Sequence, residues 1–208
     1  MLHDRFIFYQ NFPDLDFCWF WGNETRLELI KRMRYVAVEP KMPVNVNYNN
    51  AMYAVAGEAA ARVAGVPFEK LVRNKILRPL GLLNTGFSMT DMSESSNFAV
   101  PFLADSYEDA TAGRFNELPL DNAIQKTAAA GDIYSTALDL SRWGQVIMKG
   151  GKQNGKQVLS KEGIEATLSA HTIFAPAIHD PEFPLSLQYG MGWALNSYKG
   201  NNFYEHSK

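Results

Sequence analysis

Apolar residues recur every three or four positions along several stretches of the chain, a spacing that predicts amphipathic helices. The first such stretch follows Thr25, with Leu27, Ile30 and Met33 on one helical face. Thr25 and Glu28 stand three residues apart, which is the pattern of a capping box at a helix start. The two prolines in "VEPKMPV" then exclude a helix, because proline lacks the backbone N–H that a helix interior needs.

A second helix is predicted after the polar run "NYNN", which ends at Asn50. Gly65 marks the end of this helix, and Pro67 marks the start of a third helix, which stops before Pro79. The residues expected to face the core are Met52, Val55, Ala56, Ala59 and Val63 in the second helix and Phe68, Leu71, Val72 and Ile76 in the third.

Turns are predicted where glycine, asparagine and proline gather. The segment "PLGLLNTGF" contains Gly81 and Gly86, both expected at positive φ. Asn154 and Gly155 form the dipeptide typical of a tight hairpin turn. Residues 88–127 are polar and show no clear period, so they are expected to be irregular.

Two more helices are predicted in the second half of the chain. The longer one follows "AAAGDIYST" and stops at the paired glycines 150 and 151, and a short one runs from its cap at Ser160 to about Leu168. The positions of the longer helix that are expected to face inward are Leu140, Trp143 and Ile147.

The last segment changes to strand character. Leu187–Tyr198 is predicted to be one strand, "KGNN" a turn and "FYEH" the start of a return strand. A single hairpin is marginally stable in water. The tail therefore either packs on other parts of this chain or belongs to a larger sheet.

Composition and charge exclude several classes of protein. The 208 residues are 46% hydrophobic and 20% charged, with a net charge of −2, which gives no strong attraction to nucleic acid or to a membrane surface. The basic cluster Arg26–Arg34 is expected to be a solvated helix face. Cys18 is the only cysteine, so neither an intrachain disulfide nor a cysteine-based zinc site is expected. No signal peptide or membrane-spanning run is visible, so the sequence indicates no particular localisation and the cytoplasm is the default expectation.

The polar residues offer few independent catalytic motifs. The nucleophile elbow, the phosphate loop and the zinc-protease helix motif are absent. The four histidines, at positions 3, 171, 179 and 206, lack the spacing of metal ligands, so no metal site is expected. Asp14 and Asp16 could act as an acid–base pair, but turn formation is the alternative that their aromatic loop favours.

Tyr48 and Asn50 stand two residues apart at the entrance of the second helix. If the backbone is extended there, both side chains point the same way, and a phenol and an amide suit proton transfer and substrate binding. The alternative is purely structural: Asn49 or Asn50 caps the helix, and Tyr48 is a core residue with its hydroxyl in water. The local pattern favours the structural alternative.

From about Phe12 to its end, the chain resembles the serine β-lactamase and penicillin-binding-protein superfamily, closest to the class C-like branch that includes esterases and D-aminopeptidases. The segment "YNN" at 48–50 resembles the Tyr-x-Asn motif of that branch. The segment "PLGLLNT" resembles a Pro-Leu-Gly-Met-x-x-Thr turn, with Leu82 in place of methionine. "AAAGDIYSTALDLSRWG" and "YGMGWAL" also fit, and "EHS" at 205–207 resembles the strand that carries a Lys/His-Ser/Thr-Gly motif.

The resemblance implies an α+β, β-lactamase/transpeptidase-like fold, mostly the helical subdomain with an incomplete antiparallel sheet. The expected organisation is one partial domain over residues 1–208. Within it, 1–22 is a degenerate or loop-like start, 23–186 is the helical region, and 187–208 begins the C-terminal sheet hairpin.

The same resemblance implies a mechanism, in which a serine of a Ser-x-x-Lys motif attacks a carbonyl carbon and forms an acyl-enzyme. Carried over, Tyr48 is the general base and acid. Asn50, His206 and Ser207 bind substrate, the last two from the edge strand. No cofactor is implied.

This chain departs from the pattern in two places. None of its serines is followed three residues later by lysine, and Lys208 stands where the last motif carries glycine. The upstream segment "FYQNFP" places Phe8 in the position of a family histidine and Asn11 in that of a glycine. A fragment that lacks the Ser-x-x-Lys segment is therefore expected, inactive alone.

Two functional hypotheses remain open. One is a part of a serine hydrolase that acts on a β-lactam, a D-amino peptide or an ester, and the other is a non-catalytic binding or interaction module derived from that family. The expected partners are a small-molecule or peptide acyl substrate and, through an exposed sheet edge, a second copy of the chain, but neither nucleic acid nor a membrane. The sequence does not separate the three substrate classes.

Overall fold

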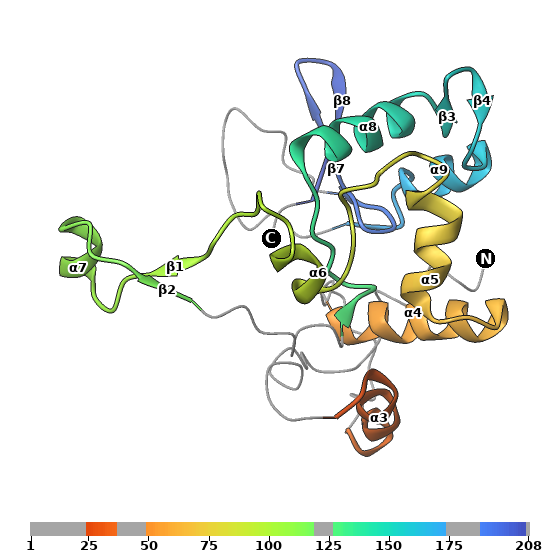
Figure 1. The fold of residues 1–208 in the computed structure, drawn as a ribbon. Helices are drawn as coiled ribbons and strands as arrows, with labels where there is room; N and C mark the ends of the chain where they lie inside the picture. The colour runs from red at the N-terminus through yellow and green to blue at the C-terminus, as the bar shows by residue number, and fades with distance from the viewer. Residues whose placement is uncertain (1–23, 37–48, 119–126, 174–187, 207–208) are drawn as a thin grey trace.

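The computed structural model describes residues 24–36, 49–118, 127–173 and 188–206, in which helices enclose two small cores beside an antiparallel sheet (Figure 1). The seven α-helices of these residues are α3 (Arg26–Arg32), α4 (Asn50–Ala64), α5 (Phe68–Val72), α6 (Met89–Ser93), α7 (Tyr107–Thr111), α8 (Ala137–Met148) and α9 (Lys161–Thr167). A 3₁₀ turn at Met33–Tyr35 extends α3, and a π turn at Arg73–Leu77 extends α5. The strands are β1 (Phe102–Leu103), β2 (Asn116–Glu117), β3 (Lys152–Gln153), β4 (Lys156–Gln157), β5 (Thr172–Ile173), β6 (Gln188–Tyr189), β7 (Ala194–Tyr198) and β8 (Asn201–Glu205).

Several predictions lie outside the described residues and are not tested. They are the start 1–22 with Cys18, Asp14 and Asp16, the histidines at 3 and 179, and the two site residues Tyr48 and Ser207.

The predicted helix ends are confirmed where local chemistry sets them. Thr25 and Glu28 form the capping box, each side chain bonding to the backbone of the other residue. Asn49 caps α4 by accepting a hydrogen bond from the N–H of Met52 at 3.2 Å. At the other end of α4, Gly65 takes φ +68°, the left-handed conformation that glycine adopts without steric cost.

The first core forms where α3 packs against α4. Its buried members are Leu29, Met33, Ala51, Met52 and Ala54. The prediction of the buried face of α4 was right for Met52 and wrong for Val63, which is 92% exposed.

Small residues explain the face that α4 does bury. Ala54, Gly57 and Ala61 form a buried stripe three and four residues apart. A Cβ at Gly57 would lie 2.4 Å from the Cβ of Ala129, so only glycine lets the segment around Ala129 approach this closely. Val63 is outside this stripe.

The second core joins α5, α8 and the turn between α5 and α6. Its buried members are Leu77, Leu80, Leu82, Phe87, Ala128 and Val146, with Phe68, Val72, Ile76, Trp143, Val158 and Leu159 packed around them. The prediction for α8 holds for Ile147 and Trp143 and fails for Leu140, which is 58% exposed. In the first turn of α8, Asp139 occupies the inward position and is 1% exposed. The neighbouring Leu140 therefore faces outward.

Gly81 takes the predicted positive φ, but Gly86 does not. Gly86 instead exchanges two backbone hydrogen bonds with Tyr134, at 3.1 and 3.0 Å. A Cβ at Gly86 would come within 2.5 Å of the Tyr134 hydroxyl oxygen. Glycine is therefore needed at position 86 for close approach and not for backbone conformation.

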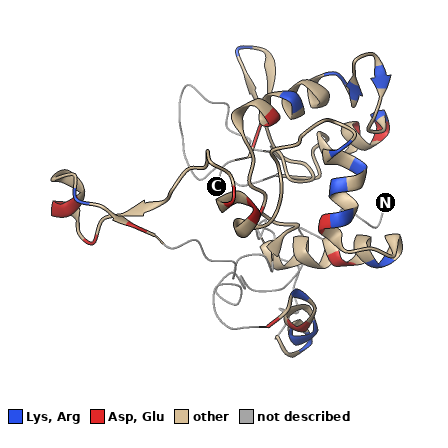
Figure 2. Cartoon of the chain, viewed as in Figure 1, with Lys and Arg blue, Asp and Glu red and all other residues tan. Residues whose placement is uncertain are grey.

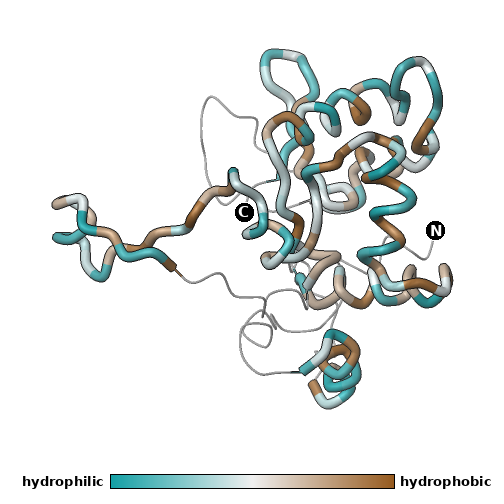
Figure 3. Tube along the Cα trace, in the orientation of Figure 1, coloured by the Kyte–Doolittle hydropathy of each residue, from teal (hydrophilic) through white to brown (hydrophobic). Residues whose placement is uncertain are grey.

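Residues 88–118 contain more structure than their sequence suggested. The helix α6 is followed by an arm, defined as residues 101–118, in which β1 and β2 pair and carry α7 at the tip. Figure 1 shows the arm extending away from the other elements, and Figure 3 shows that β1 is apolar whereas β2 is hydrophilic. Its exposed large residues are Phe102, Leu103, Tyr107, Phe115 and Leu118. The prediction of an irregular segment was wrong here.

The C-terminal sheet has the strand order β5–β6–β7–β8, with every pairing antiparallel. The sheet begins at β5, earlier than the predicted start at residue 187. The prediction of one strand over 187–198 was also wrong, because a turn at Gly190–Trp193 separates β6 from β7. A Cβ at Gly190 would lie 2.3 Å from the carbonyl oxygen of Thr167, so this turn packs tightly against the end of α9.

The charged residues are distributed unevenly over these elements. Figure 2 shows Lys and Arg along α3, α5 and the β3–β4 hairpin, and Asp and Glu on α6 and α7 as well as on α4 and α9. The prediction of a solvated basic face holds for Lys31 and Arg32, which are exposed. Arg26 differs, because its guanidinium bonds to Glu69 and so ties α3 to α5.

Candidate functional site

The predicted residues of the Tyr-x-Asn segment stand at the entrance of α4. Asn49 is 3% exposed and serves as the helix cap, so its role is structural, as expected. Asn50 is the first residue of α4, half-buried, with its side-chain Oδ1 atom buried. Asn49, and not Asn50, is therefore the N-cap residue of α4.

Asn50 shares one face of α4 with Tyr53 and Gly57, at spacings of three and seven residues. The close approach of Gly57 to Ala129 places the segment 127–132 against this face. That segment carries a buried carboxylate: Asp132 is 7% exposed and accepts a hydrogen bond from the Thr127 hydroxyl at 2.6 Å. The sequence did not single out Asp132, which sits in a small-residue turn typical of exposed loops.

His206 follows β8 and lies beside β6. Its Nδ1 atom is 2.9 Å from the carbonyl oxygen of Gly192 and 3.1 Å from the hydroxyl oxygen of Tyr189. The Tyr189 and His206 rings meet edge to face, with centroids 6.2 Å apart and planes at 61°. Tyr189 is 4% exposed, so the imidazole rests on a buried aromatic ring.

Asp139 supports the turn that precedes α6. Its carboxylate accepts hydrogen bonds from the Asn84 N–H at 2.8 Å, the Thr85 hydroxyl at 2.9 Å and the Arg142 guanidinium at 2.9 Å. Asp139, from the segment "AAAGDIYSTALDLSRWG", is therefore hydrogen-bonded to Thr85 of the turn "PLGLLNT". Arg142 also donates to the carbonyl oxygen of Gly81, at 3.2 Å.

Among the described tyrosines, Tyr134 has a phenol whose pKa is raised by its surroundings. Burial raises the pKa of its phenol, the carboxylate of Asp91 raises it further, and the Arg73 guanidinium partly offsets both. A tyrosine with a raised pKa stays protonated, so Tyr134 is a poor base. It packs on Gly86 instead.

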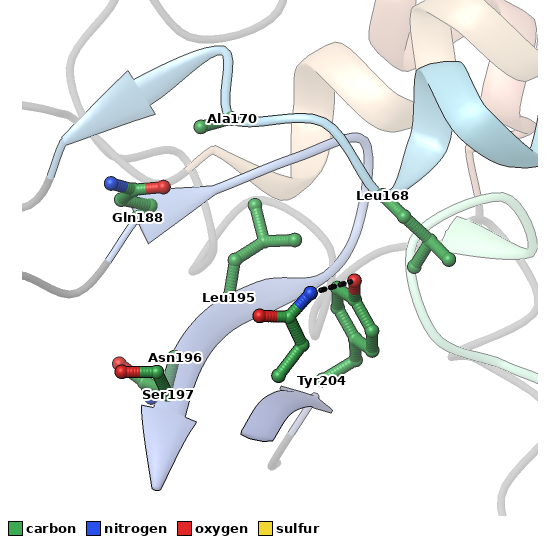
Figure 4. A pocket seen from close by; sticks show the side chains of 8 residues that line it. Leu168, Ala170, Gln188, Leu195, Asn196, Ser197 and Tyr204 are labelled. Atoms are coloured by element: carbon green, nitrogen blue, oxygen red, sulfur yellow. Dashed lines mark hydrogen bonds between the residues drawn. The ribbon is translucent and has the colours of Figure 1, made fainter. Parts of the chain in front are cut away.

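A hollow of about 230 Å³ lies on one face of the C-terminal sheet (Figure 4). Gln188, Leu195 and Tyr204 line it from three neighbouring strands, and Ser197 and Asn202 continue the lining along β7 and β8. The described residues that line it include neither a carboxylate nor a histidine, and Asn50 and His206 are not among them. These described residues offer amide and hydroxyl groups to a ligand.

In the described ranges, no three His, Cys, Asp or Glu side chains are grouped as metal ligands. The helices of the same ranges are all too short or too polar to span a bilayer.

Two of the four predicted site residues are therefore located, each on a different element: Asn50 at the start of α4 and His206 after β8. The partners of His206 were missed by sequence reasoning. The segment "YGMGW" was noticed as a whole, and the close contacts that Tyr189 and Gly192 make with an imidazole depend on strand pairing that no local pattern reveals.

A helical region beside an antiparallel sheet with this element order defines the β-lactamase/transpeptidase-like class, which confirms the predicted α+β fold. The chain belongs to the beta-lactamase family, whose model matches residues 8–207. Among solved structures, the octameric penicillin-binding protein homologue from Pyrococcus abyssi superposes with a TM-score of 0.72 at 22% identity, over 97% of this chain and 45% of that one. The D-amino acid amidase from Ochrobactrum anthropi SV3, complexed with L-phenylalanine, superposes with a TM-score of 0.66 at 18% identity, over 98% and 55%.

Two curated relatives agree with this assignment. The Unguisins hydrolase ungD' of Aspergillus campestris is 28% identical over 174 residues, which cover 83% of this chain and 30% of the relative. The putative penicillin-binding protein PbpX of Bacillus subtilis is 28% identical over 129 residues, which cover 62% of this chain and 31% of the relative. The matched part of the chain thus spans about a third of each relative's length.

Proposed function

We propose that this chain forms one side of the substrate cleft of a hydrolase that acts on an amide, β-lactam or ester through an acyl-serine intermediate. The observation that carries the proposal is the family match over residues 8–207, which runs through both the Tyr-x-Asn segment and the His-Ser segment. A β-lactamase-family domain with hydrolase, amidase and penicillin-binding relatives supports this class of chemistry.

Each predicted residue has a defined part in the proposal. Tyr48 moves the proton of the serine nucleophile, as general base and then general acid. Asn50 binds an amide group of the substrate, because its side chain both donates and accepts hydrogen bonds. His206 and Ser207 line the cleft from the sheet.

The nucleophile is not among these 208 residues in the family's usual form, since no serine is followed three residues later by lysine. The chain alone is therefore proposed to bind an acyl substrate without forming an acyl-enzyme. The same observation favours the second candidate, a non-catalytic binding or interaction module.

Covalent labelling tests the absence of acylation. The purified 208-residue chain is incubated with a fluorescent penicillin and, separately, with a fluorophosphonate probe, alongside a serine hydrolase as positive control. We expect no covalent label on this chain in intact-mass spectra. Stoichiometric labelling of any serine would contradict the proposal and identify another nucleophile.

Reversible binding tests the cleft itself. D-phenylalanine amide is titrated into the chain and followed by NMR, and Asn50→Ala is expected to weaken binding about tenfold, the cost of one lost hydrogen bond of about 1.4 kcal/mol. Asn202→Ala, which alters an asparagine in the sheet hollow, is the matched control and should leave the affinity unchanged. If Asn202→Ala weakens binding and Asn50→Ala does not, the ligand sits in the hollow and the proposed cleft is wrong.

Self-association is a separate part of the proposal. In the described sheet β8 is an edge strand, and all five of its residues are exposed. Unpaired backbone groups along such an edge bind other strands. Sedimentation velocity is expected to show concentration-dependent dimers that Phe203→Lys on β8 removes, while Phe102→Lys on the arm does not. A monomer at all concentrations would refute this.

A further inference from the structure

The hollow of the C-terminal sheet lies on one face of β6, β7 and β8. Gln188, Leu195 and Tyr204 are direct partners in the strand register, so their side chains stand in one row across the three strands. Ser197 and Asn202 are also partners, two residues further along β7 and β8, and form a second row on the same face. All five side chains line the hollow.

The space stays open because the side chains at its edge are short. Leu195 is 8% exposed and forms the floor, and Leu168, directly after α9, closes one side (Figure 4). Ala170 and Ser197 add only small side chains to the lining. The result is a hollow of about 230 Å³ with an apolar floor and a polar edge.

The polar groups of the edge are amides and hydroxyls. Gln188 and Asn202 each supply a side-chain amide, which donates and accepts hydrogen bonds, and Ser197 and Tyr204 each supply a hydroxyl, which does the same. The contact from the Asn202 amide to the Tyr204 hydroxyl is 3.4 Å long, beyond the usual range of about 2.7–3.2 Å. These two groups therefore keep most of their hydrogen-bonding capacity for a ligand.

The lining limits the chemistry of a ligand in two ways. None of the eight described residues that line the hollow is charged, so an ion would leave water without meeting a counter-charge. A purely apolar ligand would cover the amides and hydroxyls and leave them without partners. The lining therefore favours a neutral ligand that carries several hydroxyl groups on a body of C–H groups.

We infer that this hollow binds one neutral sugar ring. The hydroxyl groups of the ring bond to the amides and hydroxyls of the edge, and its C–H face packs on Leu195 and on the ring of Tyr204. Pockets for drug-sized ligands occupy about 300–1,000 Å³, so 230 Å³ suits a single ring. The inference stands on the sheet face alone, and neither Asn50 nor His206 takes part in it.

Titration of the 208-residue chain with D-glucose, followed by ¹H–¹⁵N NMR, tests the site. We expect saturable shifts of the backbone amide signals of the two rows, while the signals of α4 and of the arm stay unchanged. Sodium D-glucuronate carries a carboxylate on the same ring and is expected to bind about tenfold more weakly. Shifts that do not saturate, or that spread evenly over the chain, would refute a defined site, as would equal binding of the two sugars.

Two neighbouring asparagines give a matched pair of variants. Asn202→Ala is expected to weaken D-glucose binding about fivefold, the effect of one neutral hydrogen bond. Asn201→Ala is the control, because Asn201 faces the other side of β8 and donates to the carbonyl oxygen of Lys199. Ser197→Leu, which fills the hollow from β7, should abolish binding. Spectra of each variant without sugar show whether the sheet is intact, and equal affinities of the two alanine variants would overturn the inference.

Two further neutral ligands separate a sugar from other occupants. Cyclohexanol offers a ring with one hydroxyl group, and N-acetylglycinamide offers peptide-like amides without a ring. Both are expected to bind more weakly than D-glucose. Tighter binding of cyclohexanol would mean that the apolar floor alone selects the ligand, and tighter binding of N-acetylglycinamide would indicate a peptide site. Either result would refute the sugar assignment.

Discussion

Removing the carboxylate of Asp139 is expected to destabilise the chain more than removing any exposed carboxylate. Asp139 is 1% exposed and bonds to the Asn84 N–H, the Thr85 hydroxyl and Arg142. Asp139→Ala leaves the Asn84 N–H without its acceptor in a half-buried turn, and leaves the Thr85 hydroxyl only its neutral contact with the Ser135 hydroxyl, at 2.9 Å. The cost of such a change is set mainly by the donors left unpaired.

The magnitude follows from the three bonds taken separately. A hydrogen bond to a charged acceptor contributes about 1.5–3 kcal/mol, so the bonds from Asn84 and Thr85 together account for about 3–6 kcal/mol. The Arg142 side chain is 42% exposed, so solvent screens its ion pair with Asp139 and little is added. Since a domain is stabilised by about 5–15 kcal/mol, Asp139→Ala removes about a fifth or more of that. Asp139→Asn keeps one acceptor oxygen and should lose about half as much.

Urea titration followed by far-UV circular dichroism measures the change in the free energy of unfolding. Asp109→Ala is the matched control, because Asp109 also stands three residues after a serine or threonine helix cap and also pairs with an arginine, Arg114. Hydrogen bonds from Ser106 and Arg114 lower the pKa of the Asp109 carboxyl, but the group lies in solvent, so the control should change the urea midpoint little.

Equal midpoints for Asp139→Ala and the parent chain, or equal losses for Asp139→Ala and Asp109→Ala, would refute the reasoning. Either result would mean that the bonds to the turn contribute no more than exposed ones do.

Two further predictions concern a glycine pair and a helix cap. Gly86→Ala should destabilise the chain, because its Cβ would collide with Tyr134, whereas Gly144→Ala inside α8 meets no atom within 4 Å and should stabilise it by about 1 kcal/mol; the urea midpoints of the two variants must move in opposite directions. Hydrogen bonds from Thr25 lower the pKa of Glu28 below its ordinary value of 4.5, so the stability that this bond provides is present above that pH and is lost as the pH falls below it. The difference in stability between the parent and Glu28→Ala, which removes the carboxylate that accepts these bonds, should therefore shrink in acid, and a difference that stays constant from pH 7 to pH 3 would contradict the assignment.

Helix ends and tight turns could be predicted from the sequence because their chemistry is local. The capping box of Thr25 and Glu28 needs only a spacing of three residues, and the cap at Asn49 needs only a side-chain oxygen at the right place. The Asn154–Gly155 turn formed as predicted, with both residues at positive φ. In each case the residues that interact are neighbours in the chain.

Buried faces could not be predicted as well, because they depend on which segment arrives from elsewhere. Leu140 looked like a core residue by spacing, but the neighbouring Asp139 takes the inward position in order to bind a turn 55 residues away. Gly86 looked like a positive-φ glycine, but the ring of Tyr134 is the reason for its small size. Neither contact leaves a periodic signal.

The candidate site also contains residues that short motifs predicted and residues that no local pattern predicted. The resemblance identified Asn50 and His206 from short motifs, and the structure locates both. Tyr189 was not identified, because a buried tyrosine in a strand is also typical of a plain core, and only the pairing of β6, β7 and β8 brings its hydroxyl to Nδ1 of His206. A second contact of this kind, between Thr127 and Asp132, was equally invisible in the sequence.

The arm of residues 101–118 has its two ends joined at its base by a hydrogen bond from the Leu118 N–H to the Pro101 carbonyl, at 2.9 Å. The arm adds none of its side chains to either core. A segment with adjacent ends and no core contacts can change in length and sequence while the rest of the domain stays the same, so it is where related proteins are free to diverge. For protein engineering, the tip at Gly113, where no atom crowds the backbone, is a natural place to insert an epitope or a fluorescent reporter.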